Sequence, residues 1–231
     1  MLRRLAVFVL ADFLGLGAAL SAQDSGAPER QFWPELDAFA SLGAHARVLA
    51  DVSSSDDRDT GTSEYCAGAR LDVFLAPFGR PWLRHTPDVY KRHLFTLGGG
   101  YRYYWNGDGG TVENRLLLEA SARALPFGRL VLSNRSRLEW RDRGSWSWRY
   151  RNRTRLEREF GLGSEAVTGY FMFELSYDSR YGAWNRQRYY GGLDWPLGRK
   201  ALLDTYYCRQ HDARASPENV DAAGLKLQLF F

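Results

Sequence analysis

The sequence predicts an all-β fold: a closed up-and-down antiparallel transmembrane β-barrel that follows a cleaved signal peptide. Three observations predict it. Segments of about ten residues alternate between apolar and charged side chains, which is the period of two that strands have and helices lack. Compact turns alternate with longer polar loops along the chain. Large aromatic side chains gather toward the ends of the segments, as they do at the two interfaces of a membrane barrel.

The N-terminal residues 1–22 are typical of a secretory signal peptide. Two arginines precede the apolar stretch "LAVFVLADFLGLGAALSA", which ends in small residues, and cleavage is expected near Ala22. An uncleaved membrane anchor is the alternative, but the stretch is short for a span and Asp12 interrupts it. We expect residues 23–34 to form a periplasmic segment and residues 35–231 to form the barrel.

Strand-like segments separated by Gly, Pro, Asn and Asp follow one another along the chain. They lie near residues 64–75, 94–105, 112–125, 129–141, 146–160, 170–180, 186–195, 201–210 and 221–231. Residues 35–52 form either one bent strand or a hairpin that turns at residues 43–45. Because both termini should lie on the periplasmic side, we expect an even strand number, 10 or 12. The long connector at residues 77–93 should then be a periplasmic excursion or a small lid.

The stretch "WSWRYRNRTRLEREF", residues 146–160, shows the alternation most clearly. An arginine that faced lipid near the midplane would cost about 2–4 kcal/mol, so the four arginines of the charged face, Arg149, Arg151, Arg153 and Arg155, should point into the lumen. Carboxylates on neighbouring strands can bind them through two-pronged hydrogen bonds. We therefore predict a lumenal ionic lattice. Its members are Arg115, Glu119, Arg135, Arg137, Glu139, Arg149, Arg151, Arg153, Arg155, Glu157, Glu174, Asp178, Arg186 and Arg188.

A soluble β-sandwich would also alternate, but it would keep its large aromatic residues in the middle of the strands. Here Trp105 and Trp146 fall beside long loops, and Trp195 and Phe160 fall beside short turns, which favours the barrel. The chain ends in "AAGLKLQLFF". Its terminal Phe231 resembles the signature through which the bacterial barrel-assembly machinery recognises outer-membrane strands.

The composition gives no indication of nucleic acid, metal or cofactor binding. A formal net charge of +4 over 231 residues is too small to indicate nucleic acid. The four histidines lack the spacing of metal ligands, so we expect no metal and no cofactor. Only Cys66 and Cys208 are present, and both should face inward near the outer ends of their strands. One disulfide between them across the barrel mouth is therefore a hypothesis.

Several blocks resemble an uncharacterised family, domain of unknown function 2490. They are "FWPELDAF", "LGGGYRYYWNGDGGTVENRLLLE", "SWSWRYRNRTRLEREF", "SYDSRYGAWNRQRYYGGLDWPLG" and "YYCRQHDARASPENVDAAGLKLQLFF". The resemblance runs from about residue 32 to the end of the chain. It implies a β-barrel in the outer membrane of Gram-negative bacteria with no established activity, and it supplies no catalytic residues.

Three functions remain open. The main expectation is a non-catalytic structural barrel or narrow, porin-like pore with a lumen filled by salt bridges, and the partners expected are outer-membrane lipid and the assembly machinery. The second is a small anion-selective channel with a small anionic solute, because arginines locally outnumber carboxylates. The third is a lipid-modifying hydrolase with His211, Ser216, Asp212 and Asp204 at the outer rim, although their spacing matches no nucleophile motif.

Overall fold

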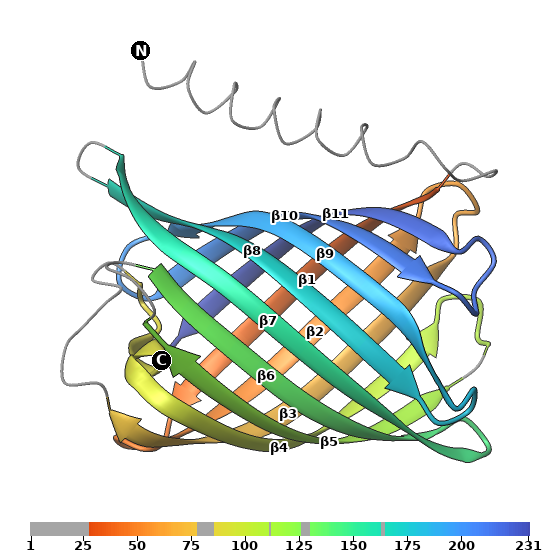
Figure 1. Ribbon diagram of the computed structural model, residues 1–231, viewed down its shortest axis with the longest axis horizontal. Helices are drawn as coiled ribbons and strands as arrows, with labels where there is room; N and C mark the ends of the chain where they lie inside the picture. The colour runs from red at the N-terminus through yellow and green to blue at the C-terminus, as the bar shows by residue number, and fades with distance from the viewer. Residues whose placement is uncertain (1–27, 78–85, 111, 126–129, 163–164) are drawn as a thin grey trace.

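The computed structural model describes residues 28–77, 86–110, 112–125, 130–162 and 165–231 (Figure 1). The signal peptide predicted over residues 1–22 lies outside these ranges. Most of the described residues lie in β-strands, and one short 3-10 helix, η1, precedes β4. The elements are β1 (Glu29–Ser41), β2 (Ala46–Asp57), β3 (Ser63–Pro77), η1 (Val89–Arg92), β4 (His93–Asn106), β5 (Glu113–Ala124), β6 (Leu130–Asp142), β7 (Trp146–Leu162), β8 (Glu165–Asp178), β9 (Ala183–Pro196), β10 (Ala201–Asp212) and β11 (Asn219–Phe230).

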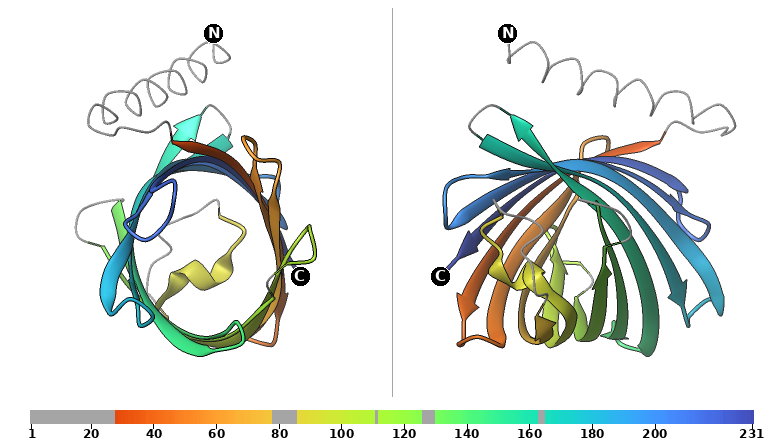
Figure 2. Two further views of the ribbon diagram at one scale, coloured as in Figure 1. Left: turned by 90° about the vertical axis from the view of Figure 1, so that its right-hand side faces the viewer. Right: turned by 60° about the vertical axis from the view of Figure 1, so that its left-hand side comes forward.

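The strands form one closed barrel, as the sequence predicts, and the end-on view in Figure 2 shows the ring. Each strand pairs antiparallel with its neighbours along the chain, and β1 closes the ring by pairing parallel with β11. That last register runs from Glu29 opposite Val220 to Phe39 opposite Phe230. Within the described ranges no helical segment is long and apolar enough to cross a membrane.

The described residues form eleven strands, so the expected even number, 10 or 12, is wrong. The N-terminal region is a hairpin, β1 and β2, that turns at residues 42–45 with Gly43 at a φ of 84°. The even number was expected because an antiparallel barrel with an even number of strands has both termini at the same end. Here β1 and β11 are parallel, so β1 begins at one end of the barrel and β11 finishes at the other. An odd number of strands therefore closes the ring. β1 also begins at Glu29, so residues 29–34 lie in the wall rather than in a periplasmic segment.

The connectors define two ends of the barrel. The loop end carries residues 58–62 and residues 213–218, and the turn end carries residues 42–45 and residues 197–200. The connector from β3 to β4, which contains η1, also belongs to the turn end.

The two faces of the wall differ in polarity. Successive side chains of a strand point to opposite faces of the sheet, and here the outward set is apolar. Leu97, Leu116 and Phe171 are each at least half exposed, at 51%, 53% and 54%. The inward set contains buried charged residues such as Glu139 and Glu174. The sandwich alternative is therefore excluded for the described wall, which is one sheet closed on itself.

Two glycines of the wall make room for inward-facing tyrosine rings on the neighbouring strand. Tyr206 lies opposite Gly224, and Tyr170 lies opposite Gly192. A Cβ atom at Gly224 would lie 2.0 Å from the ring of Tyr206, and one at Gly192 would lie 2.6 Å from the ring of Tyr170. The missing side chains thus let two aromatic rings line the interior of the barrel.

Candidate functional site: the charged lumen

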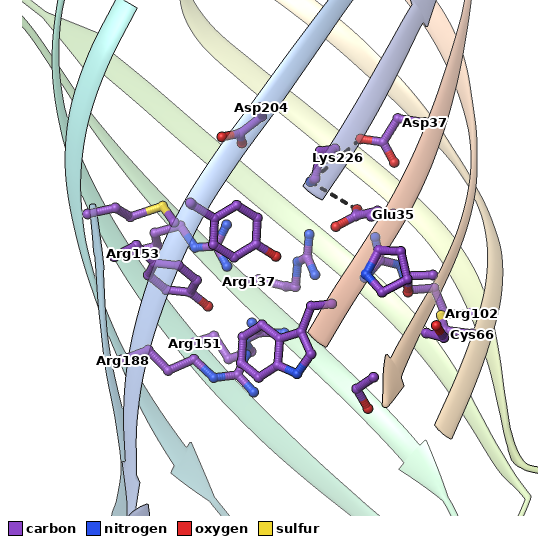
Figure 3. Close-up of a pocket in the computed structure, with 18 of the residues that line it drawn as sticks. Glu35, Asp37, Cys66, Arg102, Arg137, Arg151, Arg153, Arg188, Asp204 and Lys226 are labelled. Atoms are coloured by element: carbon purple, nitrogen blue, oxygen red, sulfur yellow. Dashed lines mark ion pairs between the residues drawn. The ribbon is translucent and has the colours of Figure 1, made fainter. Parts of the chain in front are cut away.

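The barrel encloses a cavity of about 1120 Å³, to which all eleven strands contribute side chains. Its lining runs from Ser63 and Asp108 at the loop end to Asp88 and Lys91 at the turn end. Figure 3 shows the middle of this cavity, with charged side chains from several strands directed into it. The site of interest is therefore the lumen itself.

One side of the lumen is a lattice of arginines and carboxylates on β6, β7 and β8. Arg151 Nη2 lies 2.6 Å from Glu174 Oε1, and Arg151 Nη1 lies 2.9 Å from Glu139 Oε1. Arg153 Nε lies 2.7 Å from the other oxygen of Glu174. The side chains of both glutamates are only 1% exposed. The pairs follow from register, because Glu174 is directly opposite Arg153 on β7 and Arg188 on β9.

A second group of the lattice lies toward the loop end. Arg141 bridges Glu113 and Asp178, with its Nε 2.6 Å from Glu113 Oε1 and its Nη1 2.7 Å from Asp178 Oδ2. Arg149 Nη2 lies 2.8 Å from the same oxygen of Asp178. Arg115, which is also paired with Glu113, places its guanidinium carbon 3.6 Å from the centre of the Tyr104 ring. Shared carboxylates of this kind link the strands across the barrel interior.

The structure places every predicted member of the lattice on the inner face and in at least one ion pair. Those residues are Arg115, Glu119, Arg135, Arg137, Glu139, Arg149, Arg151, Arg153, Arg155, Glu157, Glu174, Asp178, Arg186 and Arg188. The prediction was nevertheless incomplete, because charged residues outside this set belong to the same network. They are Glu35, Asp37, Arg47, Asp51, Arg70, Asp72, Asp88, Lys91, Arg102, Glu113, Arg141, Asp194, Asp212 and Lys226. A single charge between apolar neighbours, as in "ELDAF" or "RLDVF", was the signal that could have identified the members on β1 and β3.

The side of the lumen formed by β1, β10 and β11 is sparser and acidic. Lys226 Nζ lies 2.9 Å from Glu35 Oε1 and 3.7 Å from Asp37 Oδ2. The other oxygen of Asp37 is buried and has no hydrogen-bond partner within the described chain. Asp204 accepts a hydrogen bond of 2.8 Å from the hydroxyl of Tyr170. Figure 3 shows Glu35, Asp37 and Lys226 apart from Arg153 and Arg188, so the cavity separates an acidic side from a basic side.

The turn end of the lumen is occupied by residues 86–92. Arg47 Nη1 on β2 lies 2.9 Å from Asp88 Oδ1. The ring of Tyr90 stacks on Phe74 with their centres 4.1 Å apart, and its hydroxyl donates a hydrogen bond to the carbonyl oxygen of Gly43 at 2.9 Å. The left view of Figure 2 shows this segment inside the ring of strands. Residues 78–85 of the expected excursion at 77–93 lie outside the described ranges, and residues 86–92 fold into the barrel instead of away from it.

Lys91 connects this segment to the far wall. Its Nζ lies 3.3 Å from Glu157 Oε2 on β7 and 3.3 Å from Asp194 Oδ2 on β9. Burial lowers the pKa of Lys91, but these two carboxylates outweigh burial and raise the pKa above its usual value. Burial raises the pKa of Asp88, but Arg47 and Lys91 outweigh it and hold the pKa below its usual value. Both groups are therefore charged near neutral pH and hold the segment across the lumen.

The two cysteines do not form the hypothesised disulfide. Cys66 and Cys208 are both buried and both free. They lie on the inner face, as expected, but on β3 and β10, which are separated in the wall by β2, β1 and β11. Four strand spacings amount to about 19 Å along the wall. A disulfide requires Cα atoms within about 7 Å, so the closed ring keeps the two thiols apart.

The residues considered for a hydrolase are not brought together. The described contact of His211 is from Nδ1 to Asn219 Oδ1 at 3.3 Å. Asp212 binds Asn185 and Arg186, and Asp204 accepts from Tyr170. In the described part of the chain no group of three or more His, Cys, Asp or Glu residues is arranged to hold a metal ion. The contacts described for His211, Asp204 and Asp212 thus run to other residues and do not join the three to one another.

The closed wall, with its apolar exterior and charged interior, shows that the protein is a β-barrel with a polar lumen. The chain belongs to the family described as a protein of unknown function, DUF2490, whose family model matches residues 62–221. This match confirms the resemblance found in the sequence, and it spans β3 to β10 and the start of β11. A comparison with curated proteins finds no match.

Proposed function

We propose that the protein is a non-catalytic β-barrel of the bacterial outer membrane whose lumen is a charged vestibule, open at the loop end and closed at the turn end by residues 86–92. The observation that carries the proposal is the distribution of side chains, which are charged on the inner face of the wall and apolar on the outer face. Carboxylates and guanidinium groups fill the interior, while leucine, valine and aromatic side chains cover the exterior. Large exposed apolar surfaces are unfavourable in water and match hydrocarbon.

The aromatic side chains on the outer face support a membrane position. Trp148 stacks on Tyr177 with ring centres 5.2 Å apart, and Tyr65 stacks on Trp105 at 5.7 Å. All four lie at the loop-end portions of their strands. Aromatic girdles of this kind occupy the interfacial region of a bilayer.

The C-terminal strand supports recognition by the barrel-assembly machinery. Leu225 in the middle of β11 and Phe231 directly after the strand are exposed, at 41% and 68%. β11 also closes the ring by pairing with β1. A strand that both closes the barrel and ends in an exposed aromatic residue is available to an assembly partner until closure.

The closed vestibule follows from the contacts of the plug segment, residues 86–92. Asp88 binds the near wall through Arg47, and Lys91 binds the far wall through Glu157 and Asp194. The cavity lining reaches the loop-end residues Ser63 and Asp108 in the other direction. A solute could therefore enter from the loop end and would meet the plug segment at the turn end.

Cell fractionation and planar-bilayer recording test the proposal. The mature protein should sediment with outer membranes and should require detergent for purification. Reconstituted protein should give no steady conductance steps. A protein that is freely soluble without detergent would overturn the membrane assignment.

An anion-selective channel is the second candidate. It is favoured by the local excess of guanidinium groups on β6, β7 and β9, where Glu174 alone is ion-paired with four arginines. Steady anion-selective steps from the wild-type protein would establish this function and would contradict the closed vestibule.

A further inference from the structure

We infer that the lumen contains a binding site for a small organic oxyanion, a ligand with a carboxylate or phosphate group on an apolar body, centred on Arg135. The inference rests on the proposed vestibule and names its ligand class. Arg135 is an arginine of the lattice whose nearest carboxylate oxygens lie 3.6 and 3.7 Å away.

Arg135 stands out by its distances. Its nearest carboxylate oxygens are Glu119 Oε2 at 3.6 Å and Glu174 Oε2 at 3.7 Å. Both distances exceed those of charge-assisted hydrogen bonds, which are about 2.7–2.9 Å. By contrast, Arg137 and Arg153 approach the same two oxygens to 2.7 Å. Among the described residues no hydrogen bond is donated by the Arg135 guanidinium, although this side chain lines the cavity.

The register of β6 and β7 increases the local positive charge. Arg135 is directly opposite Arg153, and the next inward pair is Arg137 opposite Arg151. Like charges directly across two strands are destabilising. Two neighbouring pairs of arginines therefore face the lumen without an intervening carboxylate on either strand.

The nearby carboxylates are already shared. Glu119 is ion-paired with Arg70, Arg135 and Arg137. Glu174 is ion-paired with four arginines, Arg135 among them. Six different arginines thus converge on two carboxylates. A bound oxyanion would neutralise part of this excess positive charge. It would also accept hydrogen bonds from the N–H groups of Arg135, since a guanidinium carries five donors in a fork that fits carboxylate or phosphate.

Aromatic side chains next to this cluster indicate an apolar part of the ligand. Arg188 places its guanidinium carbon 5.1 Å from the ring centre of Trp33, and Arg153 lies 5.4 Å from that of Tyr190. Tyr190 in turn packs edge-on against Tyr206 at 5.7 Å. All of these rings line the cavity. Its volume of about 1120 Å³ is sufficient for a small molecule, whose sites measure about 300–1,000 Å³.

The acidic side of the cavity limits where an anion can sit. Glu35 and Asp37 are held by Lys226 on β11, and Figure 3 shows them apart from Arg151 and Arg153. An anionic group is repelled there and attracted to the arginines. The oxyanion should therefore bind to β6 and β7, with its apolar body toward Trp33 and Tyr190.

Isothermal titration calorimetry of the full-length protein in a zwitterionic detergent at low salt tests the site. Phenyl phosphate and benzoate are the probes, and benzylamine and benzyl alcohol are the matched cation and neutral compound. We expect saturable binding of the two anions and none of the other two. Inorganic phosphate should bind more weakly than phenyl phosphate, because it lacks the ring.

Variants of one residue then locate the site. Arg135→Gln should weaken phenyl phosphate binding at least tenfold, and Arg135→Lys, which keeps the charge but loses the fork, should give an intermediate affinity. Arg209→Gln is the control, because Arg209 pairs with Asp221 and does not line the cavity. Thermal unfolding shows whether each variant is folded. Because Arg135 has only long ion pairs and a like-charged neighbour, its loss of binding should come without loss of stability.

Each result decides between alternatives. Absence of saturable anion binding, equal binding by Arg135→Gln, or equal binding of benzylamine would overturn the site. The proposed vestibule is judged separately by conductance. A protein that conducts ions steadily but still binds phenyl phosphate through Arg135 keeps the oxyanion site and loses only the closed plug.

Discussion

The two sides of the lumen differ in how their buried charged side chains are paired. On β6 and β8 the buried carboxylates Glu139 and Glu174 are each shared by three or more arginines. On the inner face of β1, β10 and β11 the acidic side chains outnumber the basic ones. Lys226 is ion-paired with both Glu35 and Asp37, and one oxygen of Asp37 has no hydrogen-bond partner in the described chain. The first side cross-links strands, and the second leaves room for the cavity. A buried charge is stable only with partners, so the lattice should tolerate fewer changes than the sparse side.

The largest effect should come from the carboxylate with the most partners. Glu174→Gln keeps the shape of the side chain but leaves Arg151 and Arg153 without their shortest ion pairs. Breaking a buried pair in this way costs about 3–5 kcal/mol. Reversible denaturant unfolding in detergent measures the loss. Glu64→Gln is the matched control, since its side chain is 40% exposed and its partner Arg143 lies 3.9 Å away; that variant should stay close to the wild type, and equal losses would contradict the comparison.

A steric change on the sparse side should have the next largest effect. Gly224→Ala places a Cβ atom against the ring of Tyr206, and overpacking of this kind costs about 1–3 kcal/mol. The same unfolding assay measures it. Combining Gly224→Ala with Tyr206→Leu should restore part of the stability, because the smaller side chain leaves the space. No recovery in the double variant would show that the ring is not the cause.

The plug segment should respond to pH at both extremes. Asp88 faces Arg47, Lys91 and Arg123, and its pKa is lowered, so its contribution is full above the unfolded pKa and is lost as pH falls through the lowered value. Lys91 faces Glu157, Asp194 and Arg155, and its pKa is raised. Its contribution is full below the unfolded pKa and is lost as pH rises through the raised value.

Hydrogen exchange of residues 86–92 measures this response. Protection should be greatest at intermediate pH and should fall at the acid and the alkaline limits. Asp88→Asn should reduce the acid limb and leave the alkaline limb unchanged, because protonation of Glu157 also weakens the Lys91 contact at low pH. Lys91→Met should remove the alkaline limb. Protection that is constant with pH in the wild type would show that neither ion pair holds the segment.

The smallest effect should come from a residue inside the lattice. Arg135→Gln should change the free energy of unfolding by no more than about 0.5 kcal/mol, as for a side chain without special contacts. Arg151→Gln is the comparison on the neighbouring strand and should cost several times more, because Arg151 bridges Glu139 and Glu174 at 2.9 Å and 2.6 Å. Similar losses for both variants would mean that Arg135 is as structural as Arg151.

The sequence pattern predicted about half of the charged residues of the lumen and the wrong closure of the barrel. The alternation in residues 146–160 places Arg149, Arg151 and Arg153 on one face, and they lie on the inner face in the structure. The strand number was missed because an even count was imposed on a chain whose N-terminal region is a hairpin. η1 and its contacts were not foreseen either, because Asp88 and Lys91 lie in an irregular connector where side-chain periodicity carries no information.

The sequence by itself determined which side chains share a face, because the period of two in a strand is a local property of the backbone. The tertiary structure alone decided which groups meet across that face. Glu174 on β8 meets arginines of β7 and β9, and Arg135 on β6 lies opposite Arg153, only because these four strands pair in one register. Register and ring closure depend on contacts between residues far apart in the chain, so no local pattern could specify which arginine would remain without a close partner.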